Sequence, residues 1–205
     1  MPSWIKDKLQ NNLTEMTSKS GLPNSSNYRK AKPDKGNGSR YLANDLSTIL
    51  FLSKRGISRS PLAREALRKV LANSRHFGRF RIACRGVSEA YDQCPLDLRM
   101  KEAISHIKEY AFDGLSRFAL KPDLAKADLI LTMDEESEVF VKENMECIRG
   151  EVRPFGLFLP PGSLPHLPDP FLERKEHHEG HYAELIYLIE EGCEKLVETI
   201  ATLTD

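Results

Sequence analysis

The chain has 205 residues, which is enough for one domain with a sizeable hydrophobic core. It contains 30 lysine and arginine residues and 30 aspartate and glutamate residues, so its formal net charge is zero and gives no reason to expect nucleic acid as a partner. No apolar run approaches the length of a membrane span, and the N-terminus lacks the apolar stretch of a secretory signal, so we expect neither a membrane protein nor a secreted one.

The four cysteines lie far apart and form no Cys-x-x-Cys pair. They are Cys84, Cys94, Cys147 and Cys193. This spacing argues against a disulfide framework or a zinc site and favours a reducing compartment, so we expect a cytoplasmic protein without a cofactor. Residues 176–181 contain three histidines and two glutamates, with His178 and His181 three positions apart. Because no distant fourth ligand is evident, we interpret this cluster as a solvated helix start and expect no metal.

Residues 1–44 differ in composition from the rest, and we expect an arm there, followed by a domain over residues 45–205. Trp4, Leu9, Leu13 and Met16 are spaced to line one face of a short helix, which is either a tail or a docking helix. Residues 17–40 are rich in serine, asparagine, lysine, glycine and proline, which is typical of a linker. A basic arm of this kind also offers a contact for a protein partner.

Residues 48–61 predict a buried strand, a tight loop and the start of a helix. Residues 49–52 are an apolar run, as in a strand covered on both faces. Ser60 before Pro61 predicts a helix start, with a hydroxyl N-cap and proline at the first helical position. The loop carries Lys54, Arg55 and Arg59. A loop that delivers backbone N–H groups and a helix N-terminus to one point is an anion site, and an arginine beside it can bind phosphate with two hydrogen bonds.

The remaining elements alternate between strands and helices. Further strands are expected at residues 80–84, 127–133 and 151–157. Helices are expected from residue 95, at residues 121–126 and 134–144, and at residues 180–200. A proline-rich loop at residues 159–170 comes before the last helix. Alternating strands and helices predict an α/β fold with a parallel sheet, in which a ligand binds at the carboxyl ends of the strands.

The motif Ile-x-Arg-Ser-Pro at residues 57–61, between a strand and a helix, resembles the phosphate loop of the low-molecular-weight protein tyrosine phosphatases. That family has a cysteine nucleophile where this chain has Ser53, while Arg59 and Ser60 are in place. The resemblance implies that Ser53 and Arg59 occupy catalytic positions. The phosphate-binding residues that it implies are Lys54, Arg55, Gly56, Ile57, Ser58, Arg59 and Ser60.

Further landmarks in the same order support the resemblance, which covers roughly residue 46 to the C-terminus. They are the helix start at residues 95–99, the strand over residues 128–134, the segment at residues 168–171 and the pair at residues 192–193. The resemblance implies a three-layer fold with a four-stranded parallel sheet in the order 2-1-3-4, flanked by helices, with the phosphate loop after the first strand. It also implies Asp169 as the acid that protonates the leaving group and Phe171 as a pocket wall.

The loop departs from the family pattern at four positions. The family has an apolar residue, glycine and asparagine after the nucleophile, whereas this chain has Lys54, Arg55 and Gly56. Ser58 replaces a second family cysteine. Gly56 is expected to adopt without strain the left-handed backbone that the family asparagine holds. Arg55 either crowds the loop or adds a cation at its mouth.

Serine at position 53 leaves the phosphate-binding residues of the motif in place but removes the cysteine nucleophile. A helix N-terminus and an arginine lower the pKa of a cysteine enough to form a thiolate, whereas a serine needs an adjacent base. We therefore predict a domain that binds a phosphotyrosine protein, a small phosphate monoester or an oxyanion without hydrolysing it. One alternative is an active phosphatase whose cysteine was exchanged to trap ligand. Another is a scaffold that binds a protein partner and carries a vestigial loop.

Overall fold

The computed structural model describes residues 46–107, 109–171 and 178–204. The expected arm over residues 1–44, with its short helix and linker, lies outside the described residues. The helix face of Trp4, Leu9, Leu13 and Met16, the partner contact and the domain boundary at residue 45 therefore stay predictions.

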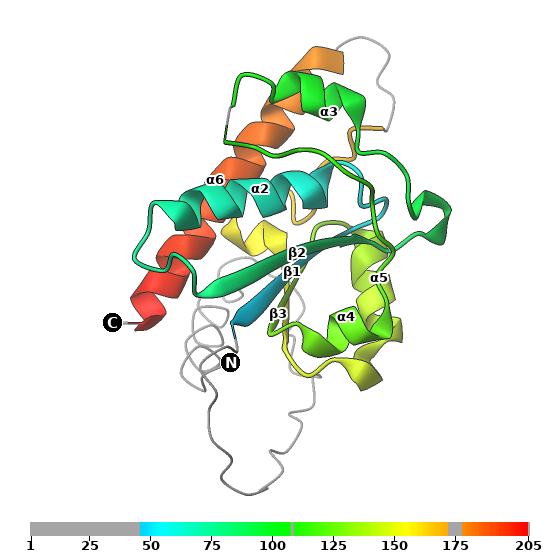
Figure 1. Ribbon diagram of the computed structural model, residues 1–205, viewed down its shortest axis with the longest axis vertical. Coiled ribbons are helices and arrows are strands. Elements are labelled where there is room, and N and C mark those ends of the chain that lie inside the picture. The colour runs from blue at the N-terminus through cyan, green and yellow to red at the C-terminus, as the bar shows by residue number, and fades with distance from the viewer. Residues whose placement is uncertain (1–45, 108, 172–177, 205) are drawn as a thin grey trace, which may run out of the picture.

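A four-stranded parallel sheet forms the centre of the domain. Its strands are β1 (Ser47–Ser53), β2 (Phe80–Gly86), β3 (Leu129–Thr132) and β4 (Glu151–Pro154). They are ordered β2-β1-β3-β4, and each neighbouring pair is parallel. The predicted α/β class and the strand order implied by the resemblance are thus confirmed. Because all strands run in one direction, their carboxyl ends lie at the same end of the sheet, and the segments that leave the strands meet there (Figure 1).

Helices cover both faces of the sheet and give three layers (Figure 1). On one face lie α2 (Arg59–Ala72), α3 (Leu98–Ala103) and α6 (His178–Thr204), and α2 and α3 both pack against α6. On the other face lie α4 (Lys121–Lys126) and α5 (Glu135–Glu143). The short 3-10 helices are η1 (Glu89–Tyr91), η2 (Met145–Cys147) and η3 (Phe155–Phe158).

Strand β1 contributes to the core on both of its faces. Ile49 and Phe51 pack in the cluster beneath α2 and α6, while Leu50 and Leu52 pack in the cluster beneath α4 and α5. Successive strand side chains point to opposite faces, so a strand buried on both sides reads as a continuous apolar run. The ring of Phe51 meets Phe155 edge-on, with the ring centroids 5.9 Å apart. This packing fixes the strand from which the candidate loop leaves.

Helix α3 begins later than the sequence indicated, at Leu98. The reason is that Asp97 caps it, and the Asp97 side chain accepts a hydrogen bond from the N–H of Arg99 at 3.1 Å. Asp97 also joins neighbouring parts of the domain, because its own N–H donates to the carbonyl of Ile57 at 2.9 Å and its carboxylate accepts from the Tyr182 hydroxyl at 2.9 Å. Helix α3 is therefore tied to the candidate loop and to α6.

The strand expected over residues 151–157 is shorter than predicted, because β4 ends at Pro154. Proline has no N–H to donate, and the backbone turns directly into η3. The apolar residues that had suggested a longer strand belong to η3, where Phe155 and Phe158 are buried.

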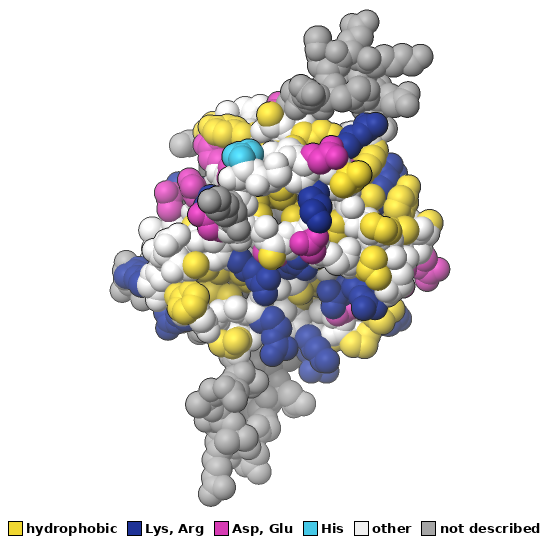
Figure 2. Space-filling view, turned by 45° about the horizontal axis from the view of Figure 1, so that its top comes forward, with side chains coloured by type: hydrophobic (Ala, Val, Ile, Leu, Met, Phe, Trp, Pro, Cys, Tyr) yellow, Lys and Arg dark blue, Asp and Glu magenta, His cyan; other side chains and the backbone are white. Residues whose placement is uncertain are grey.

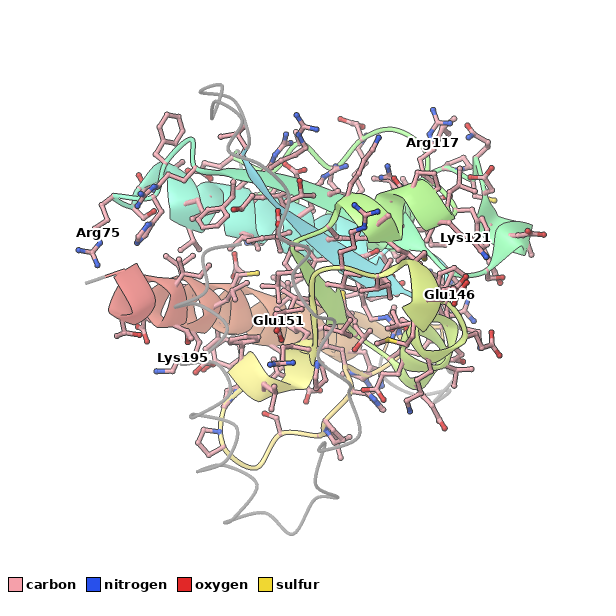
Figure 3. The ribbon with its side chains drawn as sticks, turned by 90° about the horizontal axis from the view of Figure 1, so that it is seen from below. Arg75, Arg117, Lys121, Glu146, Glu151 and Lys195 are labelled. Atoms are coloured by element: carbon pink, nitrogen blue, oxygen red, sulfur yellow. The ribbon has the colours of Figure 1, made fainter. Side chains whose placement is uncertain are left out.

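Charges of both signs cover the surface, as the zero net charge requires. On the face shown in Figure 2, basic and acidic side chains lie among one another with hydrophobic side chains between them. Figure 3 shows Lys121 of α4 and Glu146 of η2 close together, and their charged groups form an ion pair at 3.1 Å. In the part of the chain that the structure describes, no helix combines the length and the apolar character needed to cross a membrane.

Candidate active site

The loop at residues 54–58 joins the end of β1 to the start of α2. The helix begins at Arg59, with Ser58 before it, so the prediction that Ser60 is the N-cap was wrong. Ser60 lies in the first helical turn, where Pro61 is tolerated because the first N–H groups of a helix have no partner within it. The hydroxyl of Ser60 instead braces the loop. It accepts from the Ser53 hydroxyl at 2.8 Å and donates to the carbonyl of Arg85 at 3.3 Å.

Gly56 gives the loop its sharp turn. Its φ is +68°, so the expected left-handed backbone at this position is confirmed. A Cβ atom on Gly56 would lie only 2.5 Å from the backbone nitrogen of Gly86. Glycine is therefore required at this position twice, by the backbone angle and by the close approach of the end of β2.

The backbone N–H groups of residues 55–60 form a row of donors in this loop. Among the described residues none of them donates a hydrogen bond, and Pro61 has no N–H. Polar backbone groups away from water are almost always paired, so consecutive unpaired donors before a helix are a place for an anion.

Arg59, the first residue of α2, is almost fully buried, with its side chain 4% exposed. Its guanidinium pairs with the Asp134 carboxylate at 2.8 Å, donates to the carbonyl of Leu167 at 3.2 Å and lies 4.0 Å from the Asp169 carboxylate. Asp134 also accepts from the backbone N–H of Lys54 at 2.8 Å. The guanidinium is thus fixed in position by groups from two separate segments, Asp134 after β3 and the loop that contains Leu167 and Asp169.

Asp134 is a site residue that the sequence analysis missed. It was noted as the last residue of a family-like strand, and its carboxylate also caps α5 by accepting from the N–H of Ser137 at 2.9 Å. Its role as the partner of Arg59 could have been predicted from its position. Asp134 comes directly after a buried parallel strand, at the carboxyl end of the sheet where the loop also lies.

Asp169 comes from the loop before α6 and pairs with Arg55 at 2.6 Å. Burial acts to raise the pKa of this carboxyl, but hydrogen bonds from Arg55 and from the N–H of Phe171, with the nearby charge of Arg59, outweigh it and lower the pKa below its ordinary value. Asp169 is consequently ionised at neutral pH. To act as an acid, it must first lose its contact with Arg55.

Two aromatic rings flank the Arg55 guanidinium at the mouth of the loop. Its central carbon lies 4.7 Å from the ring centroid of Phe171 and 5.4 Å from that of Tyr91, within the range of cation–π contacts. Tyr91, in η1, is a second residue that the sequence analysis missed, and no pattern in the sequence pointed to it. Lys54, also partly exposed, pairs through its ammonium with Glu136 of α5.

Comparison with known families agrees with this geometry. The sequence model of the low molecular weight phosphotyrosine protein phosphatases matches residues 48–204. The chain belongs to this family. The match runs from β1 through the last residues of α6, so it includes the loop, Arg59 and Asp169.

Several solved structures have folds similar to that of this chain. YfkJ from Bacillus subtilis is 24% identical, with a TM-score of 0.68 over 83% of this chain and 100% of that one. A protein tyrosine phosphatase from Entamoeba histolytica with Hepes in its active site is 20% identical, with a TM-score of 0.67 over 78% of this chain and 99% of that one. At these identities the likeness shows the fold alone.

A third similar structure is a Cys-to-Ser mutant of the YwlE arginine phosphatase with a phosphorylated active-site serine. It is 21% identical, with a TM-score of 0.61 over 75% of this chain and 95% of that one. None of the curated proteins compared with the chain matches it.

Ser53, which the resemblance assigns to the nucleophile position, is 2% exposed. Within the described ranges, its hydroxyl has a single hydrogen-bond partner, the hydroxyl of Ser60. A hydroxyl is a poor general base, so no described group that bonds to Ser53 can remove its proton.

No group of three or more histidine, cysteine, aspartate or glutamate residues among those described is arranged to hold a metal ion. Of the cluster considered above, Glu176 and His177 lie outside the described residues, and so do the side chains of His178 and Glu179. The expected absence of a metal at that cluster stays a prediction.

Proposed function

We propose that this phosphatase-family domain binds a phosphate monoester, on a protein or on a small molecule, and does not hydrolyse it. The observation that carries the proposal is the row of unpaired N–H donors at residues 55–60 beside the fixed guanidinium of Arg59. These are the groups that bind phosphate at loops and helix N-termini, and none of them depends on the residue at position 53.

A buried hydroxyl supports the same proposal. Ser58 is 3% exposed, and its Oγ has no hydrogen-bond partner among the residues of the structure described here. A buried polar group left unpaired costs about 1–3 kcal/mol, which a ligand oxygen would offset.

The absence of turnover follows from the chemistry of Ser53. A helix N-terminus and a guanidinium make a thiolate from cysteine, but they cannot ionise a serine hydroxyl, which needs an adjacent base. Loss of an enzyme's nucleophile can cost on the order of 10⁶ in rate. We also infer a reducing compartment, such as the cytoplasm, because all four cysteines are unpaired.

The proposal is tested by the melting temperature of the protein in increasing inorganic phosphate at constant ionic strength. Phosphate at about 100 times its dissociation constant adds roughly 2.7 kcal/mol to the free energy of unfolding. We expect this gain in the natural chain and its loss in Arg59→Ala. Arg149→Ala is the matched control. Arg149 is exposed and lies just before β4, at the end of the sheet where the strands begin, which is opposite to the loop. A melting temperature that does not respond to phosphate would contradict the proposal.

A second candidate is an active phosphatase whose cysteine was exchanged for serine. It is supported by Asp169, because a domain that only binds phosphate has no need of an acid, and by the phosphorylated serine of the YwlE mutant. This candidate predicts that Ser53 gains one phosphoryl group from an acyl or aryl phosphate and keeps it. Mass spectrometry of the peptide that contains Ser53 distinguishes the two candidates, since a domain that only binds leaves Ser53 unmodified.

A further inference from the structure

One carboxylate connects the two arginines of the loop. The Oδ2 atom of Asp169 lies 2.6 Å from Arg55, and its Oδ1 atom lies 4.0 Å from Arg59. The two guanidiniums are therefore close enough for a single small acidic group to lie between them. The pair consists of one cation deep in the loop and one at its mouth.

Arg55 is held at the mouth by three groups from two separate segments. Its side chain is 17% exposed, and it contacts Tyr91 after β2, Asp169 and Phe171 before α6. The guanidinium occupies the space between the two rings, so a flat ring from a ligand cannot enter that space while Arg55 remains there.

Binding of phosphate in the loop changes the balance at Arg55. A phosphate dianion on Arg59 would repel the Asp169 carboxylate, which lies 4.0 Å from Arg59. When Asp169 moves away, the Arg55 guanidinium loses its carboxylate but keeps its aromatic contacts. A planar guanidinium in this position is suited to a second carboxylate or phosphate group.

We propose that Arg55 determines the ligand class of this site. The loop takes a phosphate monoester that carries a second acidic group, with the phosphoryl group on Arg59 and the second group in the place of the Asp169 carboxylate on Arg55. A plain aryl phosphate is disfavoured, because its ring must displace Arg55 from between Tyr91 and Phe171. This inference rests on the proposed function and names the substrate class of the same site.

The experiment measures the binding of three probes by calorimetry at neutral pH. The probes are inorganic phosphate, phenyl phosphate and 2-phosphoglycolate, which carries a carboxylate next to its phosphoryl group. In the natural chain we expect 2-phosphoglycolate to bind about tenfold more tightly than inorganic phosphate, the gain from one additional charge-assisted pair. We expect phenyl phosphate to bind no more tightly than inorganic phosphate.

Arg55→Gly should reverse this order. The preference for 2-phosphoglycolate over phosphate should disappear, and phenyl phosphate should become the tighter ligand. Because each result is a ratio to inorganic phosphate in the same variant, a general weakening of the loop does not affect it. Arg149→Gly removes the same charge at the opposite end of the sheet, where the strands begin. This variant should keep the order of affinities of the natural chain.

Two failures can be told apart. If the natural chain binds none of the three probes, the proposed function is wrong and this inference is overturned with it. If inorganic phosphate binds but the ratios are the same in the natural chain and in Arg55→Gly, phosphate binding stands and Arg55 has no role in selection. A natural chain that prefers phenyl phosphate would also overturn the inference and would favour phosphotyrosine as the ligand.

Discussion

The buried end of the phosphate loop and its mouth are built differently. At the buried end, Ser53, Ser58, Arg59 and Ser60 are all less than 5% exposed, and the one cation is fixed by Asp134. At the mouth, Lys54 and Arg55 are partly exposed and pair with Glu136 and Asp169.

The two ends also differ in how far they follow the family pattern. The resemblance to the family implies that the buried end keeps the family residues except at two cysteine positions, which Ser53 and Ser58 occupy. The same resemblance implies that Lys54 and Arg55 at the mouth stand where the family has an apolar residue and glycine. We therefore expect phosphate binding to depend on the buried end and the choice of ligand to depend on the mouth.

The largest effect is expected from restoring a thiol at the buried end with Ser53→Cys. The new thiol would lie at the N-terminus of α2 beside Arg59, so its pKa should fall well below the free value of about 8.5. Hydrolysis of aryl phosphates should follow, with a gain of up to about 10⁶ over the serine protein. Thiol titration and the release of p-nitrophenol measure the two effects separately.

The mouth should limit this restored activity. Adding Arg55→Gly to Ser53→Cys should raise the rate further, because it frees Asp169 to be protonated and opens the space between Tyr91 and Phe171. Asp169→Asn should then weaken hydrolysis most for poor leaving groups, which depend most on protonation. A thiol that titrates at its free value would show that the loop is not placed at the helix N-terminus.

A smaller effect, on stability, is expected when Arg59→Ala leaves the Asp134 carboxylate without its cation. Both side chains are less than 10% exposed, so the charge cannot be solvated freely. We expect a loss of about 3 kcal/mol in the free energy of unfolding, the lower end for a broken buried pair, because two backbone N–H groups still bond to Asp134. Urea unfolding measures the loss, and the double variant Arg59→Ala/Asp134→Asn should recover part of it. Equal stability of the natural and single-variant proteins would show that the pair is not buried in solution.

The sequence predicted the fold well because the strong signals are local. The apolar run of β1 and the alternation of strands and helices identify the class, and the family motif gives the strand order. It misplaced the N-cap at Ser60 because the hydroxyl is held by Ser53 and Arg85, which are contacts that no local pattern encodes. The same reason explains Tyr91 and Asp134, which reach the loop only through the folding of other segments.

The turn between the two ends of the loop can be tested with Gly56→Ala. The change places a Cβ in a left-handed backbone and 2.5 Å from Gly86, and we expect a loss of about 2 kcal/mol in stability together with weaker phosphate binding. Gly78→Ala is the matched control, because Gly78 has a similar φ of +74° and nothing within 4 Å of its Cβ position. The control should lose about 1 kcal/mol and keep phosphate binding. Equal losses in the two variants would mean that the approach to Gly86 can relax.

The smallest effect concerns the pH dependence of the mouth. Burial alone would raise the pKa of Asp169, but its hydrogen bonds with Arg55 and Phe171 and the charge of Arg59 lower it below the ordinary value of 3.8. A carboxyl whose pKa is lower in the folded state adds stability in full above its unfolded pKa, and this stability is lost as the pH falls through the folded value. Asp169→Asn should therefore cost at most about 1 kcal/mol at neutral pH, and its difference from the natural chain should shrink below pH 3.8. Melting temperatures between pH 7 and pH 3 measure this difference.

In an Arg55→Gly background the cost of Asp169→Asn at neutral pH should be smaller, because the hydrogen bond and charge that Arg55 contributes are gone. A cost that is unchanged in that background would show that Arg55 does not hold Asp169 in solution.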